Sequence, residues 1–150
     1  MKVALGSDHA GFPGKEAAKR VLEQLGIPYE DFGTATDAES VDYPDYARAV
    51  GEAVVRQQAD VGLLFCGTGI GIGIAANKIP GIRAAVVHDV ETARLAREHN
   101  DANVLAMGVR NTSPDLLPAV IETFLKTDFA GGRHARRIEK IAALEAAASR

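Results

Sequence analysis

The sequence predicts an α/β protein in which a five-stranded parallel sheet is doubly wound, so that helices cover both faces as an α/β/α sandwich. The first reason is that short apolar runs alternate along the chain with segments whose apolar residues recur at helical spacing. The second is size, because 150 residues that are 47% hydrophobic and 25% charged suit one compact domain with a sizeable core. We therefore expect a single domain over residues 1–150.

The first half of the chain begins with a strand, a helix and a second strand. Val3–Ser7 is a short apolar run, and apolar residues between 17 and 25 then follow a helical period until a glycine and a proline end the helix. Tyr29–Phe32 fits the second strand. After a polar loop, a helix is expected from about Pro44, since proline suits the first helical turn. Asp60–Cys66 is an apolar run typical of a buried strand.

The second half continues the alternation after a run of glycines. We expect a helix at Ile74–Lys78, a strand at Ile82–Val87, a helix at Glu91–Glu98 and the fifth strand at Asn103–Met107. A serine followed by proline, Ser113-Pro114, predicts the capped start of another helix.

The order of the strands decides which loops meet. We expect the order 2-1-3-4-5, with right-handed crossovers, so that the topological switch point lies between the first and third strands. Asp8 and His9 follow the first strand, and Cys66 ends the third. Both segments are therefore expected to line one crevice.

Charge and cysteine content exclude some classes of function. A formal net charge of −3 gives no support for a nucleic-acid or acidic-membrane partner. The longest uncharged stretch, residues 61–77, is glycine-rich and shorter than the roughly 20 apolar residues of a membrane span. With one cysteine the chain forms no internal disulfide, which makes a reducing, cytoplasmic location the expectation.

The stretch "LFCGTGIGIG" at 64–73 places this cysteine before four glycines at alternate positions. The spacing fits neither a dinucleotide-binding G-x-G-x-x-G motif nor a P-loop. Cys-x-x-Cys and His-x-x-x-His patterns are also missing, so we expect no metal and no other cofactor. What remains is a strand-to-helix turn in which the N–H groups of Gly67, Gly69 and Gly71 can converge on negative charge.

Cys66 has two interpretations. At the end of a strand and before a helix, its thiolate form is favoured, so that it can serve as a base in proton transfer. A lone cysteine in a strand can equally be a buried and inert core residue.

The segment His99-Asn100-Asp101 follows a helix that runs antiparallel to the strands, so it should lie at the opposite end of the sheet from Cys66. It can be a polar end of that helix. If His99 is catalytic, a second subunit must supply it.

A final helix is expected at about 132–148, with the alanine-rich segment 142–150 fraying. Arg133 and Arg137 are four residues apart and so project from one face of this helix. Together with Arg110, which follows the fifth strand, they suit a dianion. Exposed arginines can also simply be solvated.

These residues carry a family resemblance. The segments "GSDHAGF" at 6–12, "DYPDYA" at 42–47, "CGTGIGIGIAANK" at 66–78, "EHNDANVLAMG" at 98–108 and "GGRHARRI" at 131–138 closely resemble the type B ribose-5-phosphate isomerases, the family that includes the galactose-6-phosphate isomerase subunits. The resemblance implies a Rossmann-like fold and a metal-free aldose–ketose isomerase. It also implies a homodimer or a dimer of dimers with active sites between subunits, and hence a C-terminal helix that reaches a partner.

The resemblance also assigns roles to particular residues. Cys66 would move the proton between C1 and C2, and Thr68 would orient or activate the thiol. The amides of Gly67, Gly69 and Gly71 would hold the enediolate oxygen. Asp8 and His99, with Asn100 nearby, would assist opening of the sugar ring. The phosphate would be bound by His9, Arg110, Arg133 and Arg137.

Two alternatives stay open from the sequence. One is an isomerase of hexose 6-phosphates such as allose or galactose 6-phosphate, although the complete 98–108 and 131–138 segments favour the pentose. The other is a non-catalytic module that binds a sugar phosphate or a nucleotide, which would use the glycines and arginines but not Cys66 or His99.

Overall fold

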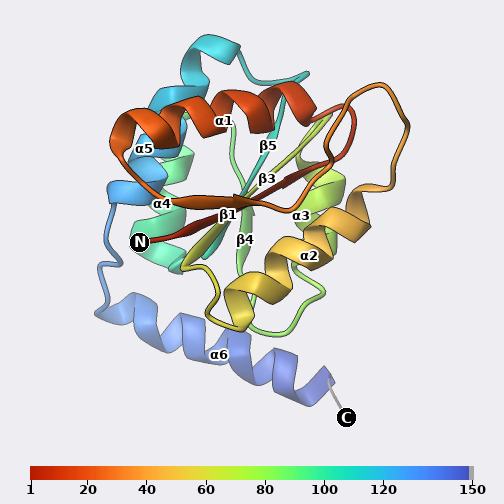
Figure 1. Cartoon of the computed structure of the whole chain (residues 1–150). Helices are drawn as coiled ribbons and strands as arrows, with labels where there is room; N and C mark the ends of the chain where they lie inside the picture. Colours follow the sequence, from red (N-terminus) through yellow and green to blue (C-terminus); the bar gives the residue numbers. More distant parts are fainter. Residues whose placement is uncertain (149–150) are drawn as a thin grey trace.

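The computed structural model describes residues 1–148 and has the predicted sheet of five parallel strands (Figure 1). Residues 149–150 of the alanine-rich end lie outside the described residues. The strands are β1 (Val3–Ser7), β2 (Tyr29–Asp31), β3 (Val61–Cys66), β4 (Ala84–Val86) and β5 (Val104–Gly108). Every pair of neighbouring strands is parallel, and the predicted fold class is confirmed.

Helices cover both faces of this sheet. They are α1 (Phe12–Leu25), α2 (Tyr43–Val55), α3 (Ile70–Ala76), α4 (Val90–Asn100), α5 (Leu117–Lys126) and α6 (Arg133–Ala148). α1, α4 and α5 cover one face of the sheet, and α2 and α3 cover the other (Figure 1). The buried residues of these helices pack against the strands of the face that they cover.

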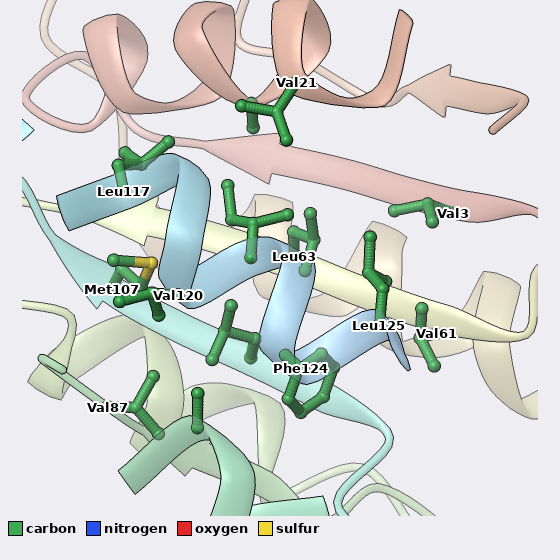
Figure 2. Close-up of a cluster of buried hydrophobic side chains, with 14 of the residues drawn as sticks. Val3, Val21, Val61, Leu63, Val87, Met107, Leu117, Val120, Phe124 and Leu125 are labelled. Atoms are coloured by element: carbon green, nitrogen blue, oxygen red, sulfur yellow. The ribbon is translucent and has the colours of Figure 1, made fainter. Parts of the chain in front are cut away.

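The side-chain alternation of the strands builds the two cores. Figure 2 shows the core on the α1, α4 and α5 side, where Leu63 of β3 and Met107 of β5 meet Val21, Val120 and Phe124 of the helices. Successive residues of a strand point to opposite faces, so Cys66 points to the α2 and α3 side. Cys66, the candidate reactive residue, therefore lies on the face of the sheet opposite to the larger core.

The predicted strand order is wrong in one place. The order is β2-β1-β3-β5-β4, so the fifth strand in sequence is central and the fourth lies at the edge. The reason is burial, since β5 is buried at all five positions whereas β4 has three residues and an exposed Val86. A central parallel strand must be apolar on both faces, and β5 fulfils that requirement better.

Two helix starts also differ from the prediction. α3 begins at Ile70, four residues before the expected Ile74, because its glycines permit close packing on the sheet. A Cβ on Gly73 would lie 2.6 Å from the Val86 side chain. Ser113 makes no side-chain cap, and Pro114 instead begins a short 3-10 turn over Pro114–Leu116.

α6 lies outside both helical layers, along the lower side of the molecule in Figure 1. Its one buried residue among those described is His134, while Ile141 and Leu144 are exposed. Within residues 1–148, no helix combines the length and apolar character needed to cross a bilayer.

Candidate active site at the carboxyl edge of the sheet

A cavity of about 380 Å³ opens at the carboxyl ends of β1 and β3. These two strands are neighbours, and the chain leaves β1 toward one edge of the sheet and β3 toward the other. The cavity is lined by Asp8, His9, Ala10, Tyr43, Cys66, Gly67, Thr68, Ile70, Gly71 and Arg110. The prediction that the Asp8-His9 and Cys66 segments line one crevice at the switch point is confirmed.

Cys66 is a free thiol that is 5% exposed and lies on the wall of this cavity. The backbone N–H of Gly69 donates a hydrogen bond to Cys66 Sγ at 3.1 Å. A donor at this distance stabilises negative charge on the sulfur. Gly69 reaches it because its φ is +80°, a conformation in which an added Cβ would lie 2.8 Å from the Met107 carbonyl carbon.

The neighbouring glycines make room for side chains of the cavity wall. A Cβ on Gly67 would lie 2.9 Å from Arg110 Nη1, and one on Gly71 would lie 2.6 Å from Tyr43 Cζ. The Arg110 backbone N–H also donates to the Gly67 carbonyl at 2.9 Å. The expected convergence of three glycine amides on a ligand is therefore only partial here, because the Gly69 amide is engaged by the thiol.

Asp8 and His9 are held by backbone donors. Asp8 is buried, and its Oδ1 accepts the N–H of Gly11 at 2.8 Å. His9 Nδ1 accepts the N–H of Val41 at 3.1 Å, from the long loop between β2 and α2. That bond leaves the proton of a neutral imidazole on Nε2, where it can be donated to a ligand.

Thr68 is exposed at the mouth of the cavity. Its Oγ1 accepts the N–H of Ile70 at 3.2 Å, so its hydroxyl hydrogen is free to be donated. Asn111 fixes the same turn by donating to the Thr68 carbonyl at 3.2 Å.

Tyr43 and Asn111 were not among the residues that sequence reasoning singled out. Tyr43 lies in the "DYPDYA" segment at the start of α2. This helix start lies at the same edge of the sheet as Cys66. The position of that helix start, directly after a strand–loop segment, is the signal that could have found it.

The remaining predicted site residues lie elsewhere. α4 runs antiparallel to the strands and ends at Asn100, so His99 and Asn100 are at the amino edge of the sheet. Asn100 lines a separate hollow of about 710 Å³ together with Ile141 and Leu144 of α6. Arg133 and Arg137 are exposed on α6. None of these four residues lines the Cys66 cavity.

The described residues, 1–148, contain no group of three or more His, Cys, Asp or Glu side chains that could hold a metal ion. The chemistry available at the Cys66 cavity comes from a thiol, a carboxyl group, an imidazole, hydroxyl groups and a guanidinium. These groups suit proton transfer on a small anionic substrate.

Comparisons with known proteins give consistent results. A family model described as Ribose/Galactose Isomerase matches residues 3–141. The putative sugar phosphate isomerase YwlF of Bacillus subtilis is 49% identical over 145 residues, which is 97% of each chain. Ribose-5-phosphate isomerase B of Escherichia coli is 44% identical over 96% of each chain. The structure of ribose-5-phosphate isomerase B of Clostridium thermocellum matches with a TM-score of 0.95 and 50% identity over 97% of each chain.

Proposed function

Because the chain belongs to the ribose/galactose isomerase family, we propose that it interconverts D-ribose 5-phosphate and D-ribulose 5-phosphate. One observation carries the proposal for this chain. The Cys66 thiol lies on the wall of a polar cavity and accepts a backbone N–H, beside Asp8, His9 and Arg110. A thiol that was only a core residue would have no need of a donor or of contact with the cavity.

In the proposed reaction, Cys66 removes the proton from C2 of the open-chain aldose, the O2 proton passes to O1, and Cys66 returns its proton to C1. The intermediate is a cis-enediolate, whose negative oxygen needs fixed donors. Each such donor contributes about 3 kcal/mol to transition-state stabilisation in comparable sites. The N–H groups of Gly67 and Gly71 and the Thr68 hydroxyl are the available donors, and a positioned base adds about 10²–10⁴-fold.

The phosphate anchors the unreactive end of the sugar. His9 donates from Nε2, since Nδ1 is engaged by Val41, and Arg110 supplies a permanent positive charge over Gly67. Binding energy from the phosphate then orients C1 and C2 against the thiol.

We further propose that a second copy of the chain completes the site in a homodimer or a dimer of dimers. Asp8 and the partner's His99 assist ring opening by removing the proton of the C1 hydroxyl and protonating the ring oxygen as the C1–O4 bond breaks. Asn100, Arg133 and Arg137 also come from the partner, with the arginines on the phosphate. Support comes from the separation of these residues from Cys66 within one chain and from the exposed apolar residues of α6.

Hexose 6-phosphates are a second candidate class of substrate, because the family description includes galactose. The two classes differ by one carbon, so turnover of ribose 5-phosphate, allose 6-phosphate and galactose 6-phosphate should be compared directly. A reducing compartment such as the cytoplasm suits a mechanism that needs a free thiol.

The test is an isomerisation assay with ribose 5-phosphate, with and without a chelator, on the wild type and on Cys66→Ala. We expect turnover that the chelator leaves unchanged and that falls by about 10²–10⁴-fold in the variant, with the same circular dichroism spectrum. Full turnover by Cys66→Ala would remove the thiol from the mechanism. If the wild-type protein binds the sugar phosphates but turns none of them over, the result would instead favour a non-catalytic binding module.

A further inference from the structure

We propose that His134 is a positioning residue for His99, holding its imidazole by ring stacking between two helices. The inference rests on the proposed function, in which His99 assists opening of the sugar ring. The ring centroids of His99 and His134 are 4.3 Å apart, and their planes are inclined by only 17°. His99 lies in the last turn of α4 and His134 in the first turn of α6, so the stack joins two separate elements.

His134 faces the body of the molecule and not the solvent. It is 8% exposed, whereas Arg133 and Arg137 on either side of it in the helix are exposed. His99 is half-buried beneath it. The two arginines therefore present a different face of α6 from the one that carries the stack.

Two hydrogen bonds join the end of α4 to the segment that leads into α6, beside the rings. The N–H of Ala130 donates to the carbonyl of Glu98 at 3.0 Å, and Arg97 Nε donates to the carbonyl of Thr127 at 3.2 Å. Gly131 and Gly132 have φ values of +67° and +56°, which turn the chain into α6. These contacts fix the approach of α6 to α4, so the stack is a built feature of the junction.

The charges around the pair favour an uncharged platform. Burial lowers the pKa of His134, and the positive charges of His99, Arg133 and Arg137 lower it further, with Glu98 opposing them. A neutral His134 ring adds no like charge against His99 when His99 gains a proton. Stacking also restricts the His99 ring to one plane, which is the requirement for delivering a proton to a defined atom.

The test separates ring opening from proton transfer at carbon. Ribulose 5-phosphate is open-chain, because its C5 oxygen carries the phosphate, so exchange of its C1 hydrogen with solvent deuterium needs Cys66 but not ring opening. We expect His134→Ala to slow isomerisation of ribose 5-phosphate by about tenfold or more, while deuterium exchange into ribulose 5-phosphate stays near the wild-type rate. His134→Phe keeps a flat ring without a titratable nitrogen and should restore most of the isomerisation.

Arg136→Ala, an exposed change on the same helix, is the matched control and should alter neither rate. An equal loss of isomerisation and of deuterium exchange in His134→Ala would overturn the positioning role. So would a His134→Phe variant that does not regain isomerisation and has a raised KM. Either result would indicate loss of phosphate binding or of the fold. Unchanged rates in His134→Ala would also overturn the positioning role. A wild type without isomerase activity would contradict the proposed function itself, which keeps the two failures distinguishable.

Discussion

Two glycines beside the candidate thiol differ in what an added methyl group would meet. On Gly67 the methyl group would lie 2.9 Å from Arg110 Nη1, the end of a flexible side chain. On Gly69 it would lie 2.8 Å from the Met107 carbonyl carbon, and the backbone there has a φ of +80°. We therefore expect Gly67→Ala to displace Arg110 and raise the KM for the sugar phosphate about tenfold, with little change in stability.

Gly69→Ala, in contrast, should lower the free energy of unfolding by about 1–3 kcal/mol, because a left-handed conformation is strained for alanine. It should also lower kcat, since the Gly69 amide would move away from Cys66 Sγ. Thermal unfolding and steady-state kinetics on both variants check the pair. A stability loss in Gly67→Ala that matches the loss in Gly69→Ala would contradict the assignment of Arg110 as the group that yields.

The residues that sequence reasoning found are those whose position follows from strand direction alone. Asp8, His9 and Cys66 come directly after or at the end of parallel strands, so their meeting at one edge needs no knowledge of packing. Tyr43 lines the cavity from a helix start, and Asn111 holds the Thr68 turn from a loop. Their approach depends on how α2 and the segment after β5 settle on the sheet, which no local pattern encodes.

At the level of elements, the alternation of strands and helices was predictable but the position of the fourth strand was not. Both orders of β4 and β5 satisfy the alternation and the parallel direction. The choice depends on which strand is buried on both faces, and Arg83 immediately before β4 was a polar sign that this strand lies at the edge. The switch point between β1 and β3 is the same in either order, so the predicted position of the site is unaffected.

α1 and β2 are joined by an ion pair that the proposed chemistry does not use. The ammonium group of Lys15 is fully buried and lies 2.6 Å from Asp31 Oδ2, which also receives Lys19 at 2.6 Å. Asp31→Asn would leave the buried ammonium without its main counter-charge, which costs about 3 kcal/mol or more. Lys15→Met should cost less, about 2 kcal/mol or below, because Asp31 keeps Lys19. Denaturant unfolding of both variants measures these losses of stability. A larger loss in Lys15→Met than in Asp31→Asn would contradict the prediction.

The same carboxyl group predicts a dependence of stability on pH. Burial raises the pKa of Asp31, but hydrogen bonds from Lys15, Lys19 and the Gly33 N–H outweigh it and hold the pKa below the ordinary 3.8. The unfolded chain therefore binds a proton first as the pH falls, so the stabilisation is fully present above about pH 5 and is lost progressively below about pH 4, as the pH falls through the lower pKa of the folded protein. The difference in melting temperature between wild type and Asp31→Asn should therefore shrink as the pH is lowered below about 4. A constant difference would exclude Asp31 as its source.

The whole molecule separates its two groups of candidate residues. Asp8, His9, Cys66, Thr68 and Arg110 belong to the carboxyl edge of the sheet, whereas His99, Asn100 and the α6 arginines belong to the opposite end. A parallel sheet with antiparallel helices imposes that separation, since a helix end and a strand end of the same unit lie at opposite edges. In the arrangement we propose, association of two chains brings the groups together.

Complementation between inactive chains tests this arrangement. A mixed dimer of Cys66→Ala and His99→Ala has one site with both changes and one site with neither, so an equal mixture refolded together should regain about a quarter of wild-type activity. Mixing Cys66→Ala with Thr68→Ala is the matched control, because both residues come from the same subunit in every site and no intact site can form. If tagged chains show that mixed dimers exist but the first mixture stays inactive, His99 does not act across the interface. Equal recovery in the control would equally reject shared sites, because it would point to residual activity of one parent chain.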